Sequence, residues 1–359
     1  MRIDALHPSE LSAAQAETWR GVQARRRALA SPFLSPDWAQ AVARAQGPVA
    51  GLRVVSIDDA AFFAAKVGTF TGMPVGAPLC DYQAVIADEG AALPEARAVL
   101  KALGVQRQDF SHLICGDPVF GGGVEGSHPS YVVDLDRGWA AYEAETRTKS
   151  DVLKDMARKR RKIEREVGEV RFTALSDSEA DFRTLLGWKR DQYQRTRQTD
   201  VLARPWVMRL MEDLWERRAE PFGGALYTLH IGGQLAAAQF NLRGPGVVNA
   251  WFIGHGCAFE RYSPGLVMFG DLLRWMADES AAGQALSLDL GPIAYRFKDR
   301  IANRTTEIGW GFCGMPAPAT LVRAAEYGVR RAAEALPLGR ASQWPGKAMR
   351  RLDLLRALA

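Results

Sequence analysis

Cysteine and histidine are scarce in this sequence, and neither residue type is clustered. The four cysteines lie tens of residues apart, and the five histidines are scattered along the chain. A metal site needs ligands at short, characteristic spacings, and a chain of this length needs no disulfides. We therefore expect reduced thiols and no bound metal. These residues are Cys80, Cys115, Cys257, Cys313, His7, His112, His128, His230 and His255.

Long apolar runs are also missing. One of the longest, Ala60–Ala65, has six residues and ends at Lys66, whereas about 20 are needed to cross a bilayer. The N-terminus lacks the continuous apolar core of a signal peptide, and no repeat of 20–50 residues is visible. These absences predict a soluble, cytoplasmic protein.

What the chain does have is enough apolar sequence for a large interior. Of 359 residues, 47% are apolar and 24% are charged. This composition is typical of globular proteins and excludes a wholly disordered chain. The length predicts two domains of about 150 residues each, or one large domain.

Positive charge is concentrated in two segments. Residues Arg147–Arg165 contain nine basic and three acidic side chains, and residues Ala319–Ala359 contain eight basic and three acidic ones. The net charge is +5 overall, so the rest of the chain is acidic. This asymmetry indicates an anionic partner for one or both segments. Two solvated helix faces would account for it equally well.

Hydrophobic periodicity and turn residues predict an α/β (α+β layered) fold with a mixed sheet flanked by helices. A boundary is expected near Asp136, where a long helical stretch begins. The expected helices are Ser9–Leu29, Ser35–Ala45, Pro94–Leu103, Trp139–Val167, Glu179–Gln194, Pro205–Ala219, Ser263–Glu279, Leu321–Leu336 and Lys347–Leu358. The expected strands are Gly51–Ile57, Ala60–Gly68, His112–Cys115, Tyr131–Leu135, Val170–Ala174, Ala225–Ile231, Gln234–Leu242, Gly246–His255 and Ala285–Leu290.

One helix start has the residues of an anion site. Ser263 can cap the helix, Pro264 fixes its first turn, and Gly265 permits close approach of a ligand. The first N–H groups of a helix have no intrahelical acceptor and lie at the positive end of its dipole, which suits a pyrophosphate. An ordinary capped helix would have the same sequence.

Three polar side chains follow the next strand. Asp289 lies near the carboxyl end of Leu286–Gly291, where open α/β sheets place ligands. Tyr295 and Lys298 are three residues apart and so share one helical face. A phenol and an ammonium group beside a carboxylate can move protons and bind an anion.

Together these segments resemble the second domain of the GNAT-fold acyltransferases. The closest similarity is to the subgroup linked to bacterial cellulose and exopolysaccharide synthesis, which is related to the FemABX peptidyltransferases. Tyr295-Arg296-Phe297-Lys298 departs from this pattern, because the family usually has adjacent Tyr and Lys. The matching residues are Gln234–Ala238, Tyr262–Gly265, Asp289–Gly291 and Tyr295–Lys298, and in the first half Pro32–Trp38, Cys80–Tyr82 and Lys159–Ile163.

The resemblance implies two GNAT-like domains in tandem. They are a degenerate domain over 1–136 and an acyltransferase domain over 137–318, followed by a basic helical tail over 319–359. The resemblance also implies an acetyl-CoA-dependent N-acetyltransferase without a metal, acting on an amino sugar or polysaccharide precursor in exopolysaccharide, adhesin or cell-envelope synthesis.

The resemblance assigns roles to individual residues. Tyr295 would be the acid that protonates the leaving thiolate, and Asp289 the base or the substrate anchor. The cofactor-binding residues would be Phe252, Ile253, Gly254, Ser263, Pro264 and Gly265. The substrate-binding residues would be Lys298, Lys159, Arg160, Asp81 and Tyr82.

Two other functions fit parts of the sequence. A FemABX-like aminoacyl-tRNA-dependent ligase would use the basic stretch Arg147–Arg165 for phosphates, although the sequence has no heptads for the usual coiled-coil arm. A regulatory protein would use the arginine pairs Arg330-Arg331 and Arg350-Arg351 to bind an anionic ligand such as a cyclic dinucleotide. We expect no DNA partner.

The tail also has an imperfect apolar stripe on its last helix. A basic amphipathic helix is typical of a membrane-surface or partner-binding element, and packing against the protein's own domain is the alternative. The first option predicts peripheral attachment to the inner membrane. The stripe would consist of Ala348, Met349, Leu352, Leu355 and Ala359.

Overall fold

The computed structural model describes residues 1–359 except 49–50, 282–286, 294, 338 and 359. The chain divides into two compact units, and the first is built from both ends of the sequence. Unit 1 comprises Met1–Leu29, Phe33–His128 and Glu307–Ala359, and unit 2 comprises Ala30–Pro32 and Pro129–Thr306.

Unit 1 has a sheet with strand order β1-β2-β3-β4-β5-β12. Its strand pairs are antiparallel, except that β4 and β5 are parallel. The elements are β1 (Ile3–Leu6), α1 (Ala13–Arg25), α2 (Pro36–Gln46), β2 (Leu52–Ile57), β3 (Ala61–Val67), β4 (Thr71–Pro74), α3 (Ala96–Leu103), β5 (Arg107–Ile114), β12 (Arg304–Gly314), α10 (Pro318–Ala335) and α11 (Trp344–Leu358).

Unit 2 has a sheet with strand order β6-β11-β10-β9-β8-β7, in which only β10 and β11 are parallel. The chain enters this unit within β6 (Val124–Asp134) and leaves it within β12. Its other elements are α4 (Gly138–Lys149), α5 (Val152–Glu166), β7 (Val170–Thr173), α6 (Glu179–Thr196), α7 (Pro205–Glu216), β8 (Gly223–Ile231), β9 (Gln234–Gly244), β10 (Val247–His255), α8 (Pro264–Ala281), β11 (Ser287–Gly291) and α9 (Arg296–Ile301).

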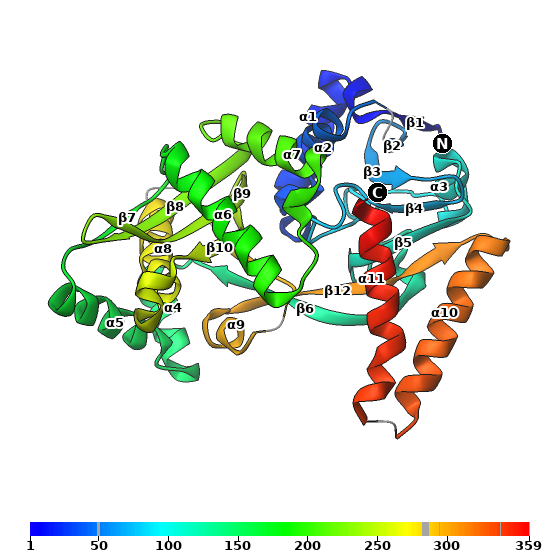
Figure 1. The fold of residues 1–359 in the computed structure, drawn as a ribbon. Coiled ribbons are helices and arrows are strands. Elements are labelled where there is room, and N and C mark those ends of the chain that lie inside the picture. The colour runs from blue at the N-terminus through cyan, green and yellow to red at the C-terminus, as the bar shows by residue number, and fades with distance from the viewer. Residues whose placement is uncertain (49–50, 282–286, 294, 338, 359) are drawn as a thin grey trace. The chain divides into compact units, whose positions relative to one another are not determined.

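The two units contain the same order of elements, from β1 to β5 in unit 1 and from β7 to β11 in unit 2 (Figure 1). In each, a strand and two helices are followed by three antiparallel strands, a helix and a last strand. The last strand is parallel to the third of the three antiparallel strands. In unit 1 the parallel pair is β4–β5, and in unit 2 it is β10–β11. The predicted α/β class and the tandem arrangement are therefore confirmed.

Local sequence explains where several elements begin and end. The Ser35 hydroxyl oxygen accepts a hydrogen bond of 3.0 Å from the Trp38 N–H, and Pro36 occupies the first helical position of α2. Gly232 and Gly233 both have positive φ in the turn between β8 and β9, a conformation that favours glycine. The single helix predicted over Trp139–Val167 is wrong, because the chain is extended at Ser150 and α5 starts anew.

A buried core in unit 2 holds α8 against the sheet. Leu272, Leu273 and Met276 on α8 have no exposed surface and pack with Val248 of β10 and Leu288 of β11. Because α8 is fixed along its length, its first residues have a defined position beside the end of β10.

The C-terminal tail is part of unit 1 and packs back on that unit. Met349 and Ala357 of α11 are buried, whereas Leu352 and Leu355 are exposed. Ala348 of the predicted stripe is exposed as well, so α11 contacts unit 1 mainly through a neighbouring face. Ala359 lies outside the described residues. No helix in the described part of the chain is long and apolar enough to cross a membrane.

Candidate active site

In the described part of the chain, strands β10 and β11 pair over three residues and then part. Their parallel register joins Val247 to Ser287 and ends at Asn249 opposite Asp289. Just beyond this point, between Asn249 and Phe252, the register of β10 with β9 is interrupted by a bulge. Bulges are common beside active sites because they redirect side chains. The divergence leaves the edge of β10 open to a ligand's polar groups.

Asn249 is the residue of this region that sequence analysis missed. It is fully buried, and neither its Nδ2 nor its Oδ1 has a hydrogen-bond partner among the described residues. A buried amide without partners is costly and points to a missing ligand or water. A signal was present, because Asn249 is a polar residue within the apolar run Val247–Ile253.

The three predicted cofactor residues on β10 have different surroundings. Phe252 is buried, and Ile253 is partly exposed beside the start of α8. A Cβ added to Gly254 would lie 2.9 Å from Leu185 Cδ1 and 3.3 Å from Trp188 Cβ on α6. Gly254 is thus required for close packing of α6 on β10, whatever its backbone contributes to binding.

A basic side chain lies at the start of α8. Ser263 has φ of 54°, and the Lys159 ammonium on α5 donates a hydrogen bond of 3.2 Å to its hydroxyl oxygen. A Cβ added to Gly265 would have one neighbour within 4 Å, Ile253 Cδ1 at 3.9 Å. The positive end of the helix, an ammonium group and open space therefore coincide, as a phosphate site requires.

Most of the positive charge of the segment Arg147–Arg165 is neutralised locally. Lys154 and Arg158 pair with Asp151 and Asp155 at 2.8 and 2.9 Å. Further pairs join Arg147 to Glu143, Lys149 to Glu145 and Arg165 to Glu166. The segment is mainly a solvated helix face rather than a broad surface for a polyanion.

Arg160 is placed differently from its neighbour Lys159. Its guanidinium pairs with Asp271 of α8, lies 3.2 Å from Glu164, and donates to the Val170 carbonyl oxygen. Burial raises the pKa of Asp271 to about 6, although Arg160 opposes this shift. These contacts link α5 to α8 and β7. The Arg160 guanidinium, which was predicted to bind substrate, is thus engaged in contacts within unit 2.

Asp289 and Lys298 both form a hydrogen bond with the backbone of Gly291 at the end of β11. Asp289 is 4% exposed, and its Oδ1 accepts a hydrogen bond of 2.8 Å from the Gly291 N–H. Lys298 Nζ donates to the Gly291 carbonyl oxygen at 3.0 Å and lies 5.9 Å from the centre of the Tyr295 ring. Tyr295 itself is 62% exposed. The structure thus brings these three predicted residues into one neighbourhood.

The predicted substrate residues Asp81 and Tyr82 belong to unit 1. They lie in the segment between β4 and α3, where Tyr82 is buried. Their role in binding stays a prediction.

Comparison with protein families decides the nature of unit 2. Residues 150–299 match the model of the acetyltransferase (GNAT) domain. Residues 150–299 form a GNAT acetyltransferase domain. The matched segment runs from the start of α5 into α9 and contains the β10–β11 divergence. The chain is accordingly an acyltransferase.

Solved structures show the same fold over most of the chain. FemX is 8% identical with a TM-score of 0.55, covering 90% of this chain and 99% of that one. A conserved protein of unknown function from Bacteroides thetaiotaomicron is 10% identical with a TM-score of 0.55, covering 88% and 100%. The C-terminal domain of a protein assigned as a lysylphosphatidylglycerol synthetase, from Agrobacterium fabrum, is 12% identical with a TM-score of 0.50, covering 87% and 96%. No curated protein sequence matches this chain.

The GNAT fold usually uses acetyl-CoA, and the residues present fit that cofactor. Lys159 and the first N–H groups of α8 suit its pyrophosphate. The open edge of β10 and the unpartnered amide of Asn249 suit the amide groups of its pantetheine arm. Among the described residues no group of three or more His, Cys, Asp or Glu side chains could hold a metal ion.

Proposed function

We propose that unit 2 transfers an acetyl group from acetyl-CoA to the amine of an amino sugar or sugar-containing precursor of an exopolysaccharide or the cell envelope. The main support for this proposed acetyl transfer is that the pairing of β10 with β11 ends at Asn249 and Asp289, beside a bulge in β10. The sequence has no Ser, His and Asp residues at the spacing of a catalytic triad. This favours direct attack by the amine without a covalent intermediate.

Each residue of the site has one task in this reaction. Acetyl-CoA supplies an activated thioester when it is bound. The N–H groups of β10 beyond Asn249 would stabilise negative charge on the acyl oxygen. Asp289, oriented by the Gly291 N–H, would accept the proton of the attacking amine. The Tyr295 phenol would give its proton to the departing sulfur, and Lys298 would bind an anionic group of the substrate.

The acetyl transfer is tested by release of free thiol from acetyl-CoA with a panel of free and nucleotide-linked amino sugars. We expect turnover with at least one acceptor and no turnover with a charged tRNA as acyl donor. Tyr295→Phe should lower kcat at least tenfold with little change in affinity for acetyl-CoA. Aminoacyl transfer from tRNA, with no thiol release, would replace this proposal by the ligase function.

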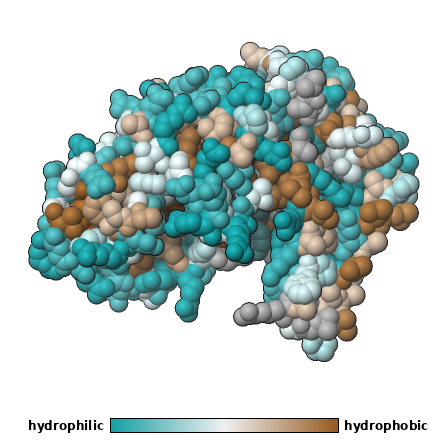
Figure 2. Space-filling view, viewed as in Figure 1, coloured by the Kyte–Doolittle hydropathy of each residue, from teal (hydrophilic) through white to brown (hydrophobic). Residues whose placement is uncertain are grey.

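We also propose that the hairpin of α10 and α11 attaches the protein peripherally to the inner membrane. Exposed apolar side chains lie on both helices, and Figure 2 shows apolar surface over this region. Exposed Lys347 on α11 suits anionic lipid. The exposed apolar residues are Leu321, Val322, Val329, Leu336, Trp344, Leu352 and Leu355.

Sedimentation with liposomes of anionic lipid at low salt tests this attachment. Trp344→Ser with Leu352→Ser should reduce the bound fraction several-fold. Phe70→Ser, which removes an equally exposed apolar side chain elsewhere in unit 1, is the matched control and should not change it. Equal partitioning of all three proteins would exclude the hairpin as an anchor.

A further inference from the structure

A cavity of about 530 Å³ lies within unit 1, which the proposed acyl transfer does not use. This volume is in the range of sites for small organic ligands. Its wall is formed on one side by residues of β4 and β5 and the segment after β4, and on the other by α10, α11 and Trp310 of β12. Apolar side chains that line it include Met73, Pro74, Phe110, Met349 and Leu354.

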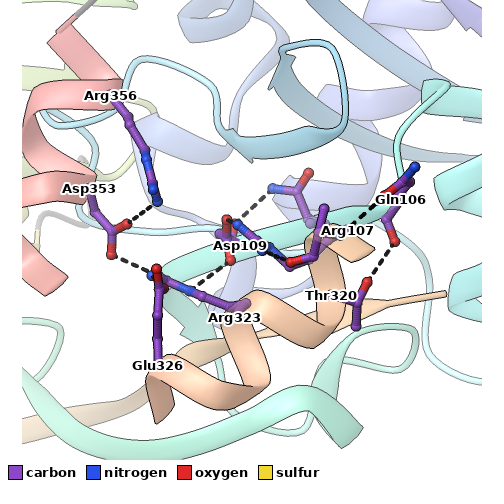
Figure 3. Close-up of polar contacts among 10 residues, drawn as sticks. Gln106, Arg107, Asp109, Thr320, Arg323, Glu326, Asp353 and Arg356 are labelled. Carbon is purple, nitrogen blue, oxygen red and sulfur yellow. Dashed lines mark hydrogen bonds and ion pairs between the residues drawn. The ribbon is translucent and has the colours of Figure 1, made fainter. Parts of the chain in front are cut away.

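The helical side of the cavity is fixed by a buried ion-pair network (Figure 3). Arg323 of α10 is 4% exposed and contacts Asp109 of β5, Glu326 of α10 and Asp353 of α11 at 3.1, 2.8 and 2.7 Å. Burial lowers the pKa of Arg323, but the three carboxylates outweigh it, so the net pKa is raised and the guanidinium stays charged. The cavity is therefore bounded by helices that are tied to the sheet and to each other.

Positive charge converges on one part of the cavity wall. A Cβ added to Gly346 would lie 3.4 Å from Arg330 Nε and 3.6 Å from Arg350 Nη1, so both guanidinium groups approach the same point. Arg330 is partly compensated by Glu334 at 2.9 Å, whereas Arg350 has no carboxylate partner in the described part of the chain. Two like charges held together beside a cavity favour an anion between them.

The remaining polar groups of the lining do not cancel this charge. Four arginines line the cavity against two aspartates, Asp109 and Asp353, and both aspartates are already paired with Arg323. Burial, and then the neighbouring His128, lower the pKa of His112 to about 4, so His112 adds no charge at neutral pH. The lining thus combines an apolar interior with an excess of guanidinium groups.

We propose that this cavity binds an organic anion with an apolar body and a single phosphate or carboxylate group. The body would lie among Met73, Phe110 and Met349, and the anionic group would bind Arg330 and Arg350 beside Gly346. Burial of the body and a charge-assisted pair both contribute to affinity, so neither an alcohol nor inorganic phosphate satisfies the site alone.

Calorimetry on the full chain tests the proposal with octyl phosphate and octanoate, each below its micellar concentration. We expect saturable binding of one molecule per chain for at least one of them, and the stronger binder identifies the anionic group. Octanol and inorganic phosphate should bind at least tenfold more weakly. No acyl donor is present, so the result is independent of the activity of unit 2.

Two variants locate the site. Arg350→Ala should weaken binding of the anion about tenfold or more, whereas Arg351→Ala, which changes an exposed neighbour outside the lining, should leave it unchanged. Gly346→Leu should block binding without removing a charge. It is the second test of the site if the Arg350→Ala protein does not fold. The proposal is overturned by absence of saturable binding, by octanol binding as tightly as octyl phosphate, or by equal effects at Arg350 and Arg351.

Discussion

The ammonium group of Lys159 lies 3.2 Å from the hydroxyl oxygen of Ser263, the residue immediately before α8. Lys159 is on α5, whose other charged residues mostly pair within the helix, so this contact distinguishes it from its neighbours. The contact brings an ammonium group to a helix end that already favours anions. We therefore propose that Lys159 binds the cofactor's phosphates, a role that differs from the substrate binding implied by the family resemblance.

Replacement of Lys159 should therefore weaken cofactor binding more than turnover. Lys159→Met keeps the apolar stem and removes the charge. A charge-assisted hydrogen bond contributes about 1.5–3 kcal/mol, so we expect the KM for acetyl-CoA to rise roughly tenfold or more, with a small change in kcat. Arg158→Met, on the exposed side of the same helix, is the control. An equal rise in KM for both variants would contradict the assignment.

Gly265 and Gly254 should respond differently to a larger side chain. Gly265→Val places its Cβ in open space, 3.9 Å from Ile253 Cδ1, so thermal stability should be retained while affinity for CoA falls. Gly254→Ala meets Leu185 at 2.9 Å and should destabilise the fold by about 1–3 kcal/mol. Calorimetric titration with CoA and thermal denaturation separate the two effects. Unchanged affinity in Gly265→Val would exclude the start of α8 as the phosphate site.

Asp271 predicts a measurable dependence of stability on pH. Its pKa is raised by burial to about 6 in the folded protein, above the ordinary value near 4 of an unfolded chain. Between these values the folded state binds more protons, so this residue makes the free energy of unfolding fall as pH rises from about 4 to about 6. Asp271→Asn should remove that slope in urea denaturation, whereas Asp278→Asn, exposed on the same helix, should not.

Arg323 should be among the most sensitive residues of unit 1 to replacement. Arg323→Met leaves Asp109 and Asp353 with one fewer cationic partner in a buried setting, which costs about 3–5 kcal/mol in comparable cases. Arg331→Met removes an exposed pair with Glu125 and should cost at most about 1 kcal/mol. Urea denaturation measures both. Similar losses would show that the network does not hold the hairpin.

Sequence patterns were sufficient for elements with clear periodicity or capping. Ser35-Pro36 predicted the start of α2, and Ser263-Pro264 the start of α8, because these residues have a direct physical role at helix ends. The described part of the strand predicted over Ala285–Leu290 is confirmed as β11, and the first two residues of that range lie outside the described part of the chain.

Some strands that depend on long-range pairing were not predicted. β4 and β12 were missed because Thr71–Pro74 is short and because glycines interrupt the alternation of Arg304–Gly314. The register that places Asn249 opposite Asp289 depends on strands separated by a helix. The arginine convergence at Gly346 likewise requires α10 and α11 to fold back together, which no local pattern specifies.

The path of the chain has a consequence for its synthesis. Unit 2 is almost contiguous in sequence, so it can fold once Thr306 and a short following segment have emerged from the ribosome. Unit 1 must wait for β12 and the hairpin, since Arg323 and Asp353 follow unit 2 in the sequence. Until then Asp109 and the apolar surface around Phe110 are exposed, because the helices α10 and α11 that pack over them have not been made. In the nascent protein, unit 2 is therefore folded while unit 1 is still incomplete. Termination of translation soon after unit 2 would leave unit 2 intact and prevent unit 1 from folding.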